Sequence, residues 1–156
     1  MNSMEVKYKS LGLYTVAGSD LEGYHEIYLD PSPNVGYIVK SFIVGLARGN
    51  TGDEVWGKIV TDKNIAVTTA KEWNYGDDQE VAWAYCNFSA NDRRAYQTAP
   101  FTGIIDPSHL LVNQCVVISD YNGAQTNRVE YIIQFEKVQI NAAQRVMALL
   151  AQRSAV

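Results

Sequence analysis

The amino-acid sequence predicts an all-β protein, an antiparallel β-sandwich or jelly roll of about eight strands with a short C-terminal α-helix. Three observations lead to this prediction. Apolar and polar residues alternate in most segments, as they do along half-buried strands. Turn-forming residues recur about every ten positions, the spacing of short strands in a sandwich. The 10 Tyr, 3 Trp and 4 Phe favour strands over helices.

The longest predicted strand runs through residues 127–140. Its first apolar residues, at every second position, are Val129, Tyr131, Ile133 and Phe135. The alternation then shifts by one residue, because Val138 and Ile140 become the apolar positions. A period-2 pattern changes phase where a strand is bulged or bent. We therefore expect a bulge or bend at Glu136 and Lys137.

The other strands are predicted, in chain order, over residues 4–8, 11–16, 24–29, 36–47, 54–61, 64–70, 80–88 and 110–118. Residues 36–47 are apolar on both faces, so this strand is expected to lie centrally and to be covered on both sides. The strand at 80–88 places large residues on one face and small ones on the other, where a neighbour packs closely. The small residues are Ala82, Ala84 and Cys86.

Residues 141–153 are predicted to form the only helix. Asn141 can cap its first turn, and Gln144 stands at the position of a capping box. Its expected apolar stripe consists of Val146, Met147, Leu149 and Leu150. Two placements stay open, since the helix can fold back on its own sandwich or dock on a neighbouring subunit.

Composition and charge narrow the classes of function. The 156 residues fit one domain, so we expect a single β-sandwich domain at 1–140 and a C-terminal helix and tail at 141–156. A net charge of −4 without a Lys/Arg-rich arm argues against strong nucleic-acid binding. No stretch has the length of a membrane span, and residues 1–10 contain no apolar signal core.

No group of residues matches a catalytic or metal-binding motif. His25 and His109 have no partners at metal-ligand spacing, and the surroundings of Cys86 and Cys115 match no known nucleophile motif. We predict no metal, no cofactor and no enzymatic activity. Whether the two cysteines pair stays open. Acidic residues at 53–54 and 77–80 are expected to be solvated turn residues, with a weak Ca²⁺ site as the alternative, and residues 120–123 match only a fragment of a calcium-binding loop.

Three tyrosines in predicted loops, Tyr75, Tyr96 and Tyr121, are the candidate ligand-binding residues. Exposed tyrosine rings suit stacking on sugars or contacts with proteins, because each ring buries a large area at a small cost in conformational entropy. The alternative is that these rings pack within their own loops.

Three segments together resemble the small single jelly-roll capsid and vertex (penton-type) proteins of viruses. They are residues 36–47 as a central strand before a hairpin, residues 106–113 with the sequence DPSHLLVN, and residues 129–140 as a long closing strand. The resemblance implies symmetric self-assembly and a location in the virion, assembled in the host cytoplasm. Many capsid proteins carry a basic N-terminal arm, whereas residues 1–10 hold only Lys7 and Lys9, offset by Glu5. Weak contact with the genome is therefore expected.

The function predicted from these features is that of a structural virion protein, a capsid or vertex subunit that binds copies of itself and other virion proteins. The amphipathic terminal segments supply its expected contact residues, which are Met4, Val6, Tyr8, Val146, Met147 and Leu150. The alternative is a carbohydrate-binding, lectin-like β-sandwich module. An enzyme on a cupin-like barrel comes third, and the isolated histidines argue against a metal-dependent cupin.

Overall fold

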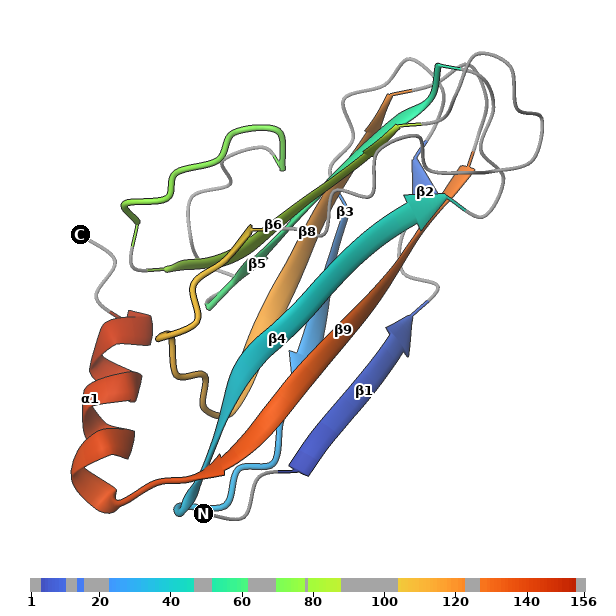
Figure 1. The fold of residues 1–156 in the computed structure, drawn as a ribbon. Coiled ribbons are helices and arrows are strands. Elements are labelled where there is room, and N and C mark those ends of the chain that lie inside the picture. The colour runs from blue at the N-terminus through green and yellow to red at the C-terminus, as the bar shows by residue number, and fades with distance from the viewer. Residues whose placement is uncertain are drawn as a thin grey trace.

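The chain forms two facing antiparallel sheets with one helix, α1 (Ala142–Arg153), at the end of the sandwich (Figure 1). The computed structural model describes residues 4–10, 14–15, 23–46, 52–61, 70–77, 79–87, 104–122 and 127–153. The predicted all-β sandwich with a short C-terminal helix is confirmed. Within the described ranges, seven strands have six residues or more and two have only two residues. The strand predicted at 64–70 lies almost wholly outside the described residues.

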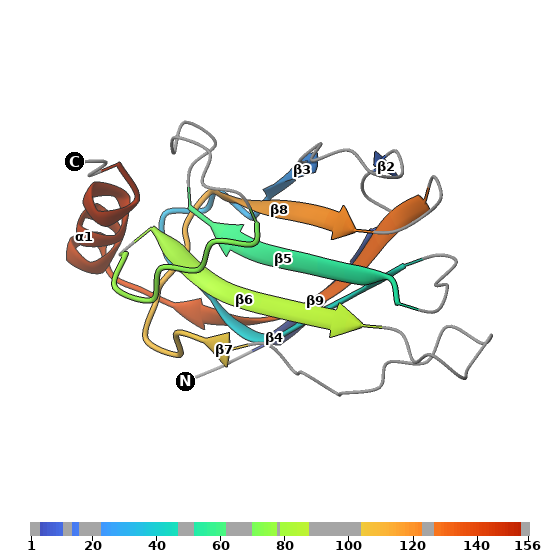
Figure 2. The same cartoon turned by 90° about the horizontal axis from the view of Figure 1, so that it is seen from above.

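The first sheet is built around the long C-terminal strand. Its members are β1 (Met4–Ser10), β2 (Tyr14–Thr15), β4 (Val35–Leu46) and β9 (Asn127–Gln139). The other three strands all pair with β9. The second sheet has the order β3 (Gly23–Tyr28), β8 (Gln114–Asn122), β5 (Glu54–Val60), β6 (Glu80–Asn87) and β7 (Ile104–Ile105). Figure 2 shows this sheet lying over β4 and β9.

The pairing of the strands is nested along the chain. The first strand pairs with the last, β3 pairs with β8, and β5 pairs with β6. Between these pairs, β4 forms a bridge to the segment before β8, where Tyr37 and Leu111 exchange N–H···O bonds of 2.9 and 2.8 Å. The pairs β4–β9 and β5–β8 then join the nested pairs into two sheets. This wound hairpin is the arrangement of a double-sheet jelly roll.

The core between the sheets is apolar and tightly packed. Tyr37 and Phe135 meet edge to face, with ring centroids 6.0 Å apart. Gly57 in β5 lies where the opposite sheet approaches closely, since a Cβ there would come within 2.7 Å of Val44 Cγ1. Cys86 and Cys115 are buried free thiols in this core, and burial raises the pKa of the Cys115 thiol to about 12. Cys115 is therefore not a reactive thiolate at neutral pH.

The bulge of the first sheet lies in a different strand from the one expected. The bulge lies in β4, where Val39 pairs with Phe135 and Ser41 pairs with Gln134, so that Lys40 is the extra residue. The prediction of a bulge at Glu136 and Lys137 is wrong, because both keep an unbroken register with β1 and β4. The bulge lets one face of β4 stay buried along its length, through Tyr37, Val39, Phe42, Val44 and Leu46.

The outer face of β4 is not covered throughout. Lys40 and Ile43 are exposed, so the expectation that residues 36–47 are covered on both sides is wrong. At the other end of the strand, Ile38 packs with Val138 and Ile140 in a small cluster beneath α1. Val138 and Ile140 are apolar because the helix covers the face on which they lie. The strand itself needs no bulge to explain them.

The helix begins as the sequence predicts. The Gln144 N–H donates to Asn141 Oδ1 and the Asn141 N–H donates to Gln144 Oε1, each over 2.9 Å, which forms a reciprocal capping box. Ala148 is buried against the cluster of Val138 and Ile140, with Leu149 packed beside it. The first of the two open placements is therefore the observed one, because α1 docks on its own sandwich.

Polar contacts hold α1 in place. The buried Gln152 amide accepts from the Val112 N–H (3.3 Å) and donates to the carbonyls of Val112 (3.1 Å) and Gln114 (3.2 Å). The Arg145 guanidinium donates to the carbonyls of Pro31 and Ser32 and to an Asn113 side-chain oxygen. These bonds fix one side of the helix to two separate connections of the sandwich.

The turn before β4 is tied to β9 by an ion pair. Lys137 Nζ lies 2.8 Å from Asp30 Oδ2, and Asp30 Oδ1 accepts from the Ser32 N–H and hydroxyl. The bond from Lys137, helped by those from Ser32, holds the pKa of Asp30 well below its usual value of 3.8. The hydrogen bond to Asp30 in turn raises the pKa of Lys137. This ion pair stabilises the turn on which Arg145 docks.

Candidate functional site

The described part of the chain contains no group of three side chains suited to hold a metal ion. His25 shares a hydrogen bond with the Tyr131 hydroxyl, and His109 lies in the turn after Asp106, whose carboxylate accepts from the Ser108 N–H and hydroxyl. Ser108 holds the pKa of Asp106 below its usual value. These contacts are those of structural polar residues.

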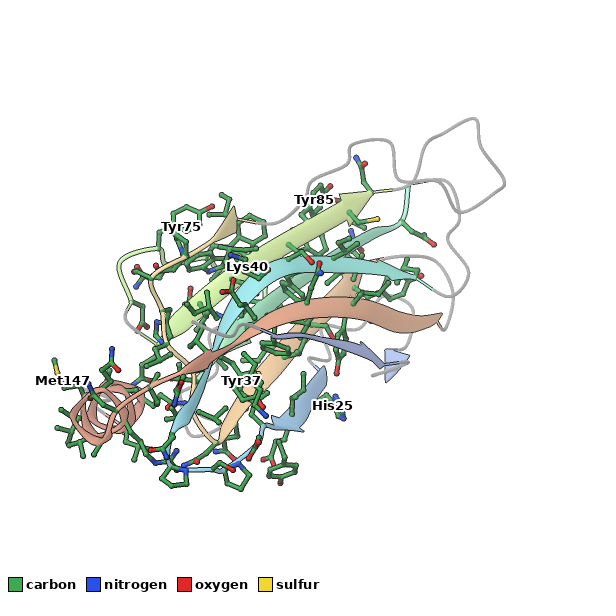
Figure 3. The ribbon with its side chains drawn as sticks, turned by 60° about the horizontal axis from the view of Figure 1, so that its bottom comes forward. His25, Tyr37, Lys40, Tyr75, Tyr85 and Met147 are labelled. Carbon is green, nitrogen blue, oxygen red and sulfur yellow. The ribbon has the colours of Figure 1, made fainter. Side chains whose placement is uncertain are left out.

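The first candidate surface is the outward side of α1, which consists of Val146, Met147 and Leu150 and is named here the α1 apolar patch. These side chains are 55%, 71% and 64% exposed. Figure 3 shows Met147 on the side of the helix turned away from the sheets. The predicted stripe is therefore divided, with Leu149 turned toward the sandwich and the other three residues toward solvent.

The N-terminal contact residues lie on an edge of the first sheet. Val6 pairs with Phe135 and Tyr8 with Ile133, while Met4 pairs with Lys137. Among the described strands, β1 pairs with β9 alone, so its second edge has no strand beside it. The burial of the β1 side chains is outside what the structure describes, and their role in subunit contacts stays a prediction.

The second candidate surface is the outer face of the second sheet. The register places Trp56 opposite Tyr85 and Lys58 opposite Trp83 on this face. Their neighbours Val55, Ile59, Ala82 and Ala84 belong to the core on the inner face. The division of large and small residues predicted for 80–88 is thus correct for Trp83 and Tyr85 on one face and for Ala82, Ala84 and Cys86 on the other. It is wrong for Val81, the third large residue, which belongs to the core because the β5–β6 register shifts between Ile59 and Val60. The sheet presents an aromatic surface away from the core.

The connection between β5 and β6 folds over part of this surface. Ala70 is buried against Val60, Val116 and Ile118, with Trp56 beside them. The Trp73 indole N–H donates to the Ala70 carbonyl over 2.8 Å, which holds the ring beside the sheet. Residues 70–77 therefore form a wall next to the exposed part of the aromatic surface.

A buried ion pair fixes this wall. Lys58 and Glu80 have fully buried side chains, and Lys58 Nζ lies 2.7 Å from Glu80 Oε1. Lys58 also donates to the Glu72 carbonyl, over 3.2 Å. Glu80 Oε2 accepts from the Asn74 N–H and from the Trp83 indole N–H, each over 2.8 Å. The pair thus joins β5, β6 and their connection in one network.

Beside the wall lies a cleft of about 360 Å³, named here the aromatic cleft, which is lined by Glu54, Trp56, Lys71, Trp73 and Tyr85. The rings of Trp56 and Tyr85 are tilted by 46° with centroids 5.4 Å apart. Lys71 Nζ lies 4.9 Å from the centroid of the Trp56 ring.

The polar groups of the aromatic cleft take part in a hydrogen bond and an ion pair. The Tyr85 hydroxyl donates to Glu54 Oε2 over 2.6 Å. Burial and the neighbouring Glu54 carboxylate raise the pKa of Tyr85 to about 12, so the phenol stays neutral at physiological pH. Lys71 Nζ lies 3.5 Å from Asp120 Oδ2. The cleft therefore offers aromatic rings together with a carboxylate acceptor and an ammonium donor.

The three tyrosines singled out from the sequence have different surroundings. Tyr75 is 56% exposed and meets Trp83 edge to face, with centroids 4.7 Å apart. Tyr121 lies within β8 and is buried in the core, so its placement in an exposed loop is wrong. Tyr96 lies outside the described residues. Neither Tyr75 nor Tyr121 lines the aromatic cleft, and the residues that do line it were not predicted as ligand-binding residues from the sequence.

The acidic residues near glycines are not all solvated. Asp53 and Glu80 are buried, which corrects the expectation for these two positions, and Asp120 is buried as well. Glu80 and Asp120 each pair with a lysine, Lys58 and Lys71 respectively. Among the described residues, these carboxylates neutralise buried or stacked lysines and are not gathered around an open ion site.

No family model, curated protein or solved structure matches the chain. In the part of the chain that the structure describes, no helix is long and apolar enough to span a membrane.

Proposed function

We propose that this protein is a structural subunit of a virion, a capsid or vertex protein that acts by symmetric contact with copies of itself and with other virion proteins. The observation that carries the proposal is the α1 apolar patch on a rigidly docked helix. Its three side chains are more than half exposed, on a helix fixed by its cap and by Gln152 and Arg145.

Rigidity is what makes this patch suitable for assembly. A helix tied down on one side presents the other side at a constant angle to the sandwich, and closed shells and rings need one repeated angle between subunits. Apolar side chains gathered on one face also favour contact with protein, because their burial removes apolar area from water. The edge of β1 that pairs with none of the described strands offers a second place for a neighbour.

The jelly roll supplies the block that such contacts join. Double-sheet jelly rolls occur in viral capsid proteins and also in lectins. The fold therefore agrees with both candidate classes and does not distinguish them. The resemblance noted in residues 36–47, 106–113 and 129–140 favours the virion. The net charge of −4 fits a subunit that holds the genome weakly or not at all. In this proposal the protein is no enzyme and acts in the virion.

Light scattering after size exclusion, with negative-stain microscopy of the same fractions, tests assembly. We expect rings or closed shells for the wild-type protein. Lysine at Met147 or Leu150 should shift the population toward monomers, since lysine keeps helix propensity and suits the C-terminal half of a helix. Deleting α1 is a poorer test, because it would also uncover Val138 and Ile140.

Ile104→Lys is the matched control, because Ile104 is a partly exposed apolar residue in β7, distant from α1 in the sequence. It should leave the assembly unchanged. A wild-type protein that stays monomeric at about 17.4 kDa at every concentration tested would contradict the proposal. So would rings or shells that persist in both helix variants, because the α1 apolar patch would then have no part in assembly.

A further inference from the structure

We propose that the aromatic cleft on the outer face of the second sheet is a binding site for neutral saccharides. This inference is independent of the virion proposal, since it uses other residues and needs no assembly. Its volume of about 360 Å³ falls within the range of about 300–1,000 Å³ that is usual for small-ligand sites.

The rings of the cleft fit the apolar faces of a sugar. The rings of Trp56 and Tyr85 line the cleft at an angle to each other, and Trp73 lines it from the connection between β5 and β6. A sugar ring exposes C–H groups on its faces, and these pack against aromatic rings as other apolar groups do. All three side chains are only partly buried, so their rings remain accessible to a ligand.

The polar groups fit the hydroxyls at the rim of a sugar. Each hydroxyl both donates and accepts hydrogen bonds. Glu54 supplies a carboxylate acceptor, and Lys71 supplies an ammonium donor on the other side of Trp56. Hydrogen bonds to charged groups are stronger than those between neutral groups, which compensates for the water that a hydroxyl loses.

The same charges disfavour other ligand classes. A cation such as a quaternary ammonium would bind an aromatic cage, but the ammonium of Lys71 already lies over Trp56. A phosphate or sulfate would meet the Glu54 carboxylate, and Asp120, 3.5 Å from Lys71 Nζ, offsets the positive charge that would attract such an anion. An apolar peptide would leave the carboxylate of Glu54 covered by groups that cannot donate to it. A neutral polyhydroxylated ligand meets none of these costs.

The site is also held in shape before a ligand arrives. The buried Lys58–Glu80 pair and the bond from Trp73 to Ala70 fix residues 70–77 against the sheet. The Tyr85 hydroxyl holds the Glu54 carboxylate beside the rings. Because these groups are already ordered, binding loses less conformational entropy than it would in a mobile loop.

The test uses the whole protein on an array of neutral, sialylated and sulfated glycans, followed by titration of the best neutral oligosaccharide. Tryptophan fluorescence reports binding directly, because two of the three tryptophans line the cleft. We expect saturable binding of at least one neutral glycan. Adding sialic acid or sulfate at the bound end of that glycan should weaken its binding.

Two variants and one control connect any binding to this site. Glu54→Gln removes the charged acceptor and should weaken binding by about tenfold or more, the loss expected for one hydrogen bond to a charged group. Trp56→Leu should weaken binding at least as much. Tyr28→Phe changes an exposed tyrosine of the same sheet, outside the cleft, and should have no effect.

The folding of each variant is checked by its far-UV circular dichroism and by an unchanged state of assembly. The proposal is overturned if no neutral glycan binds at millimolar concentration, or if binding survives both cleft variants. Preferential binding of sulfated or sialylated glycans, lost in Lys71→Gln, would also overturn it, because the site would then recognise anions. None of these outcomes depends on whether the protein forms shells.

Discussion

Replacing Glu80 with glutamine should destabilise the protein strongly, because it removes one partner of a fully buried ion pair. The Lys58 and Glu80 side chains are 0% and 1% exposed. The three donors that the Glu80 carboxylate accepts from are Lys58 Nζ at 2.7 Å, the Asn74 N–H at 2.8 Å and the Trp83 indole N–H at 2.8 Å. A glutamine amide offers one acceptor oxygen and one NH₂ group.

The size of the effect follows from this geometry. All three of these partners are donors, so the NH₂ group of the new amide must face at least one of them, and the charge of Lys58 loses its counter-ion. Breaking a buried ion pair from one side costs about 3–5 kcal/mol of the free energy of unfolding. For a chain of this size, 1 kcal/mol corresponds to roughly 2–4 °C in Tm. We therefore expect Tm to fall by roughly 6–20 °C.

Urea unfolding followed by tryptophan fluorescence measures the effect in the right place. Trp56 and Trp83 lie on the face that carries the pair, and Trp73 lies in the segment that the pair anchors. Glu136→Gln is the matched control, because Glu136 pairs with Lys40 over 3.0 Å at the surface. That substitution should cost less than about 1 kcal/mol.

A double variant separates loss of charge balance from loss of packing. Lys58→Met together with Glu80→Gln removes both charges and should be more stable than Glu80→Gln alone, since no uncompensated buried charge remains. The reasoning is refuted if Glu80→Gln and Glu136→Gln cost the same small amount. It is also refuted if the double variant is less stable than Glu80→Gln, because the ammonium of Lys58 would then not be the source of the cost.

Three further predictions concern the core, the helix and the acid limit of stability. Gly57→Ala should cost about 1–3 kcal/mol in urea unfolding by overpacking the core, while Gly76→Ala, with only one atom within 4 Å of its Cβ, should be close to neutral. Gln152→Ala should cost about 1–3 kcal/mol in the same assay, because it leaves the buried N–H and carbonyl of Val112 without their side-chain partner. The pKa of Asp30 is lowered by folding, so its contribution is present above 3.8 and lost as the pH falls below it. Asp30→Asn should therefore be less stable than wild type at pH 7, and the difference in Tm should shrink as the pH falls below 3.8; an unchanged difference would contradict the ion pair.

The strands and the helix cap could be predicted from the sequence because both depend on local pattern. Alternation of period 2 located β1, β3, β5, β6 and β9 to within a few residues, and Asn141 with Gln144 marked the start of α1. The bulge could not be placed, because its cause is spread over two strands. The sequence shows a change of phase in β9, which arises because α1 covers Val138 and Ile140, whereas the extra residue of the β4–β9 register is Lys40 in β4. Pairing is a property of both strands together.

The side of the helix that faces the sandwich could not be predicted for a related reason. Hydrophobicity alone favours Val146, Met147 and Leu150 as the buried stripe, yet the surface beneath α1 includes the backbone of residues 112–114. Backbone N–H and carbonyl groups need hydrogen-bond partners when they are covered. An amide side chain, Gln152, and the small Ala148 satisfy that surface better than large apolar residues do. A sequence pattern does not show which backbone groups a helix will cover.

The aromatic cleft was missed because its residues come from separate parts of the chain. Trp56 and Tyr85 become neighbours only through the β5–β6 register, and Lys71 reaches them from the connection between these strands. A usable signal was present, since Trp83 and Tyr85 were placed on one face of their strand. The neighbouring strand carries Glu54, Trp56 and Lys58 at alternate positions, hence on one face. Placing the two faces side by side would have indicated an aromatic outer surface with one carboxylate and one buried lysine. The tyrosines in predicted turns became the candidate ligand-binding residues because turns can be predicted from local composition.

The two proposed surfaces lie apart on the molecule, which gives a joint prediction. Figure 2 shows α1 at one end of the sandwich and β6 running away from it, and Tyr85 of the aromatic cleft belongs to the far part of β6. Assembly through the α1 apolar patch would therefore leave every cleft open, and a shell or ring would present many copies together. Multivalent contact can raise apparent affinity by about 10²–10⁴ without any new contact.

Met147→Lys should consequently weaken binding to a surface densely coated with the preferred glycan while leaving the affinity for the same soluble sugar unchanged. Surface plasmon resonance on the coated surface and fluorescence titration with free sugar provide the two measurements, and Ile104→Lys serves as the control in both. Equal weakening in both assays would show that the helix residue affects the cleft itself. If the monomeric variant and the wild type bound the coated surface equally well, and also bound the free sugar equally well, assembly would add nothing to binding. Only a loss confined to the coated surface is expected when a rigid jelly roll uses one end to assemble and one face to bind.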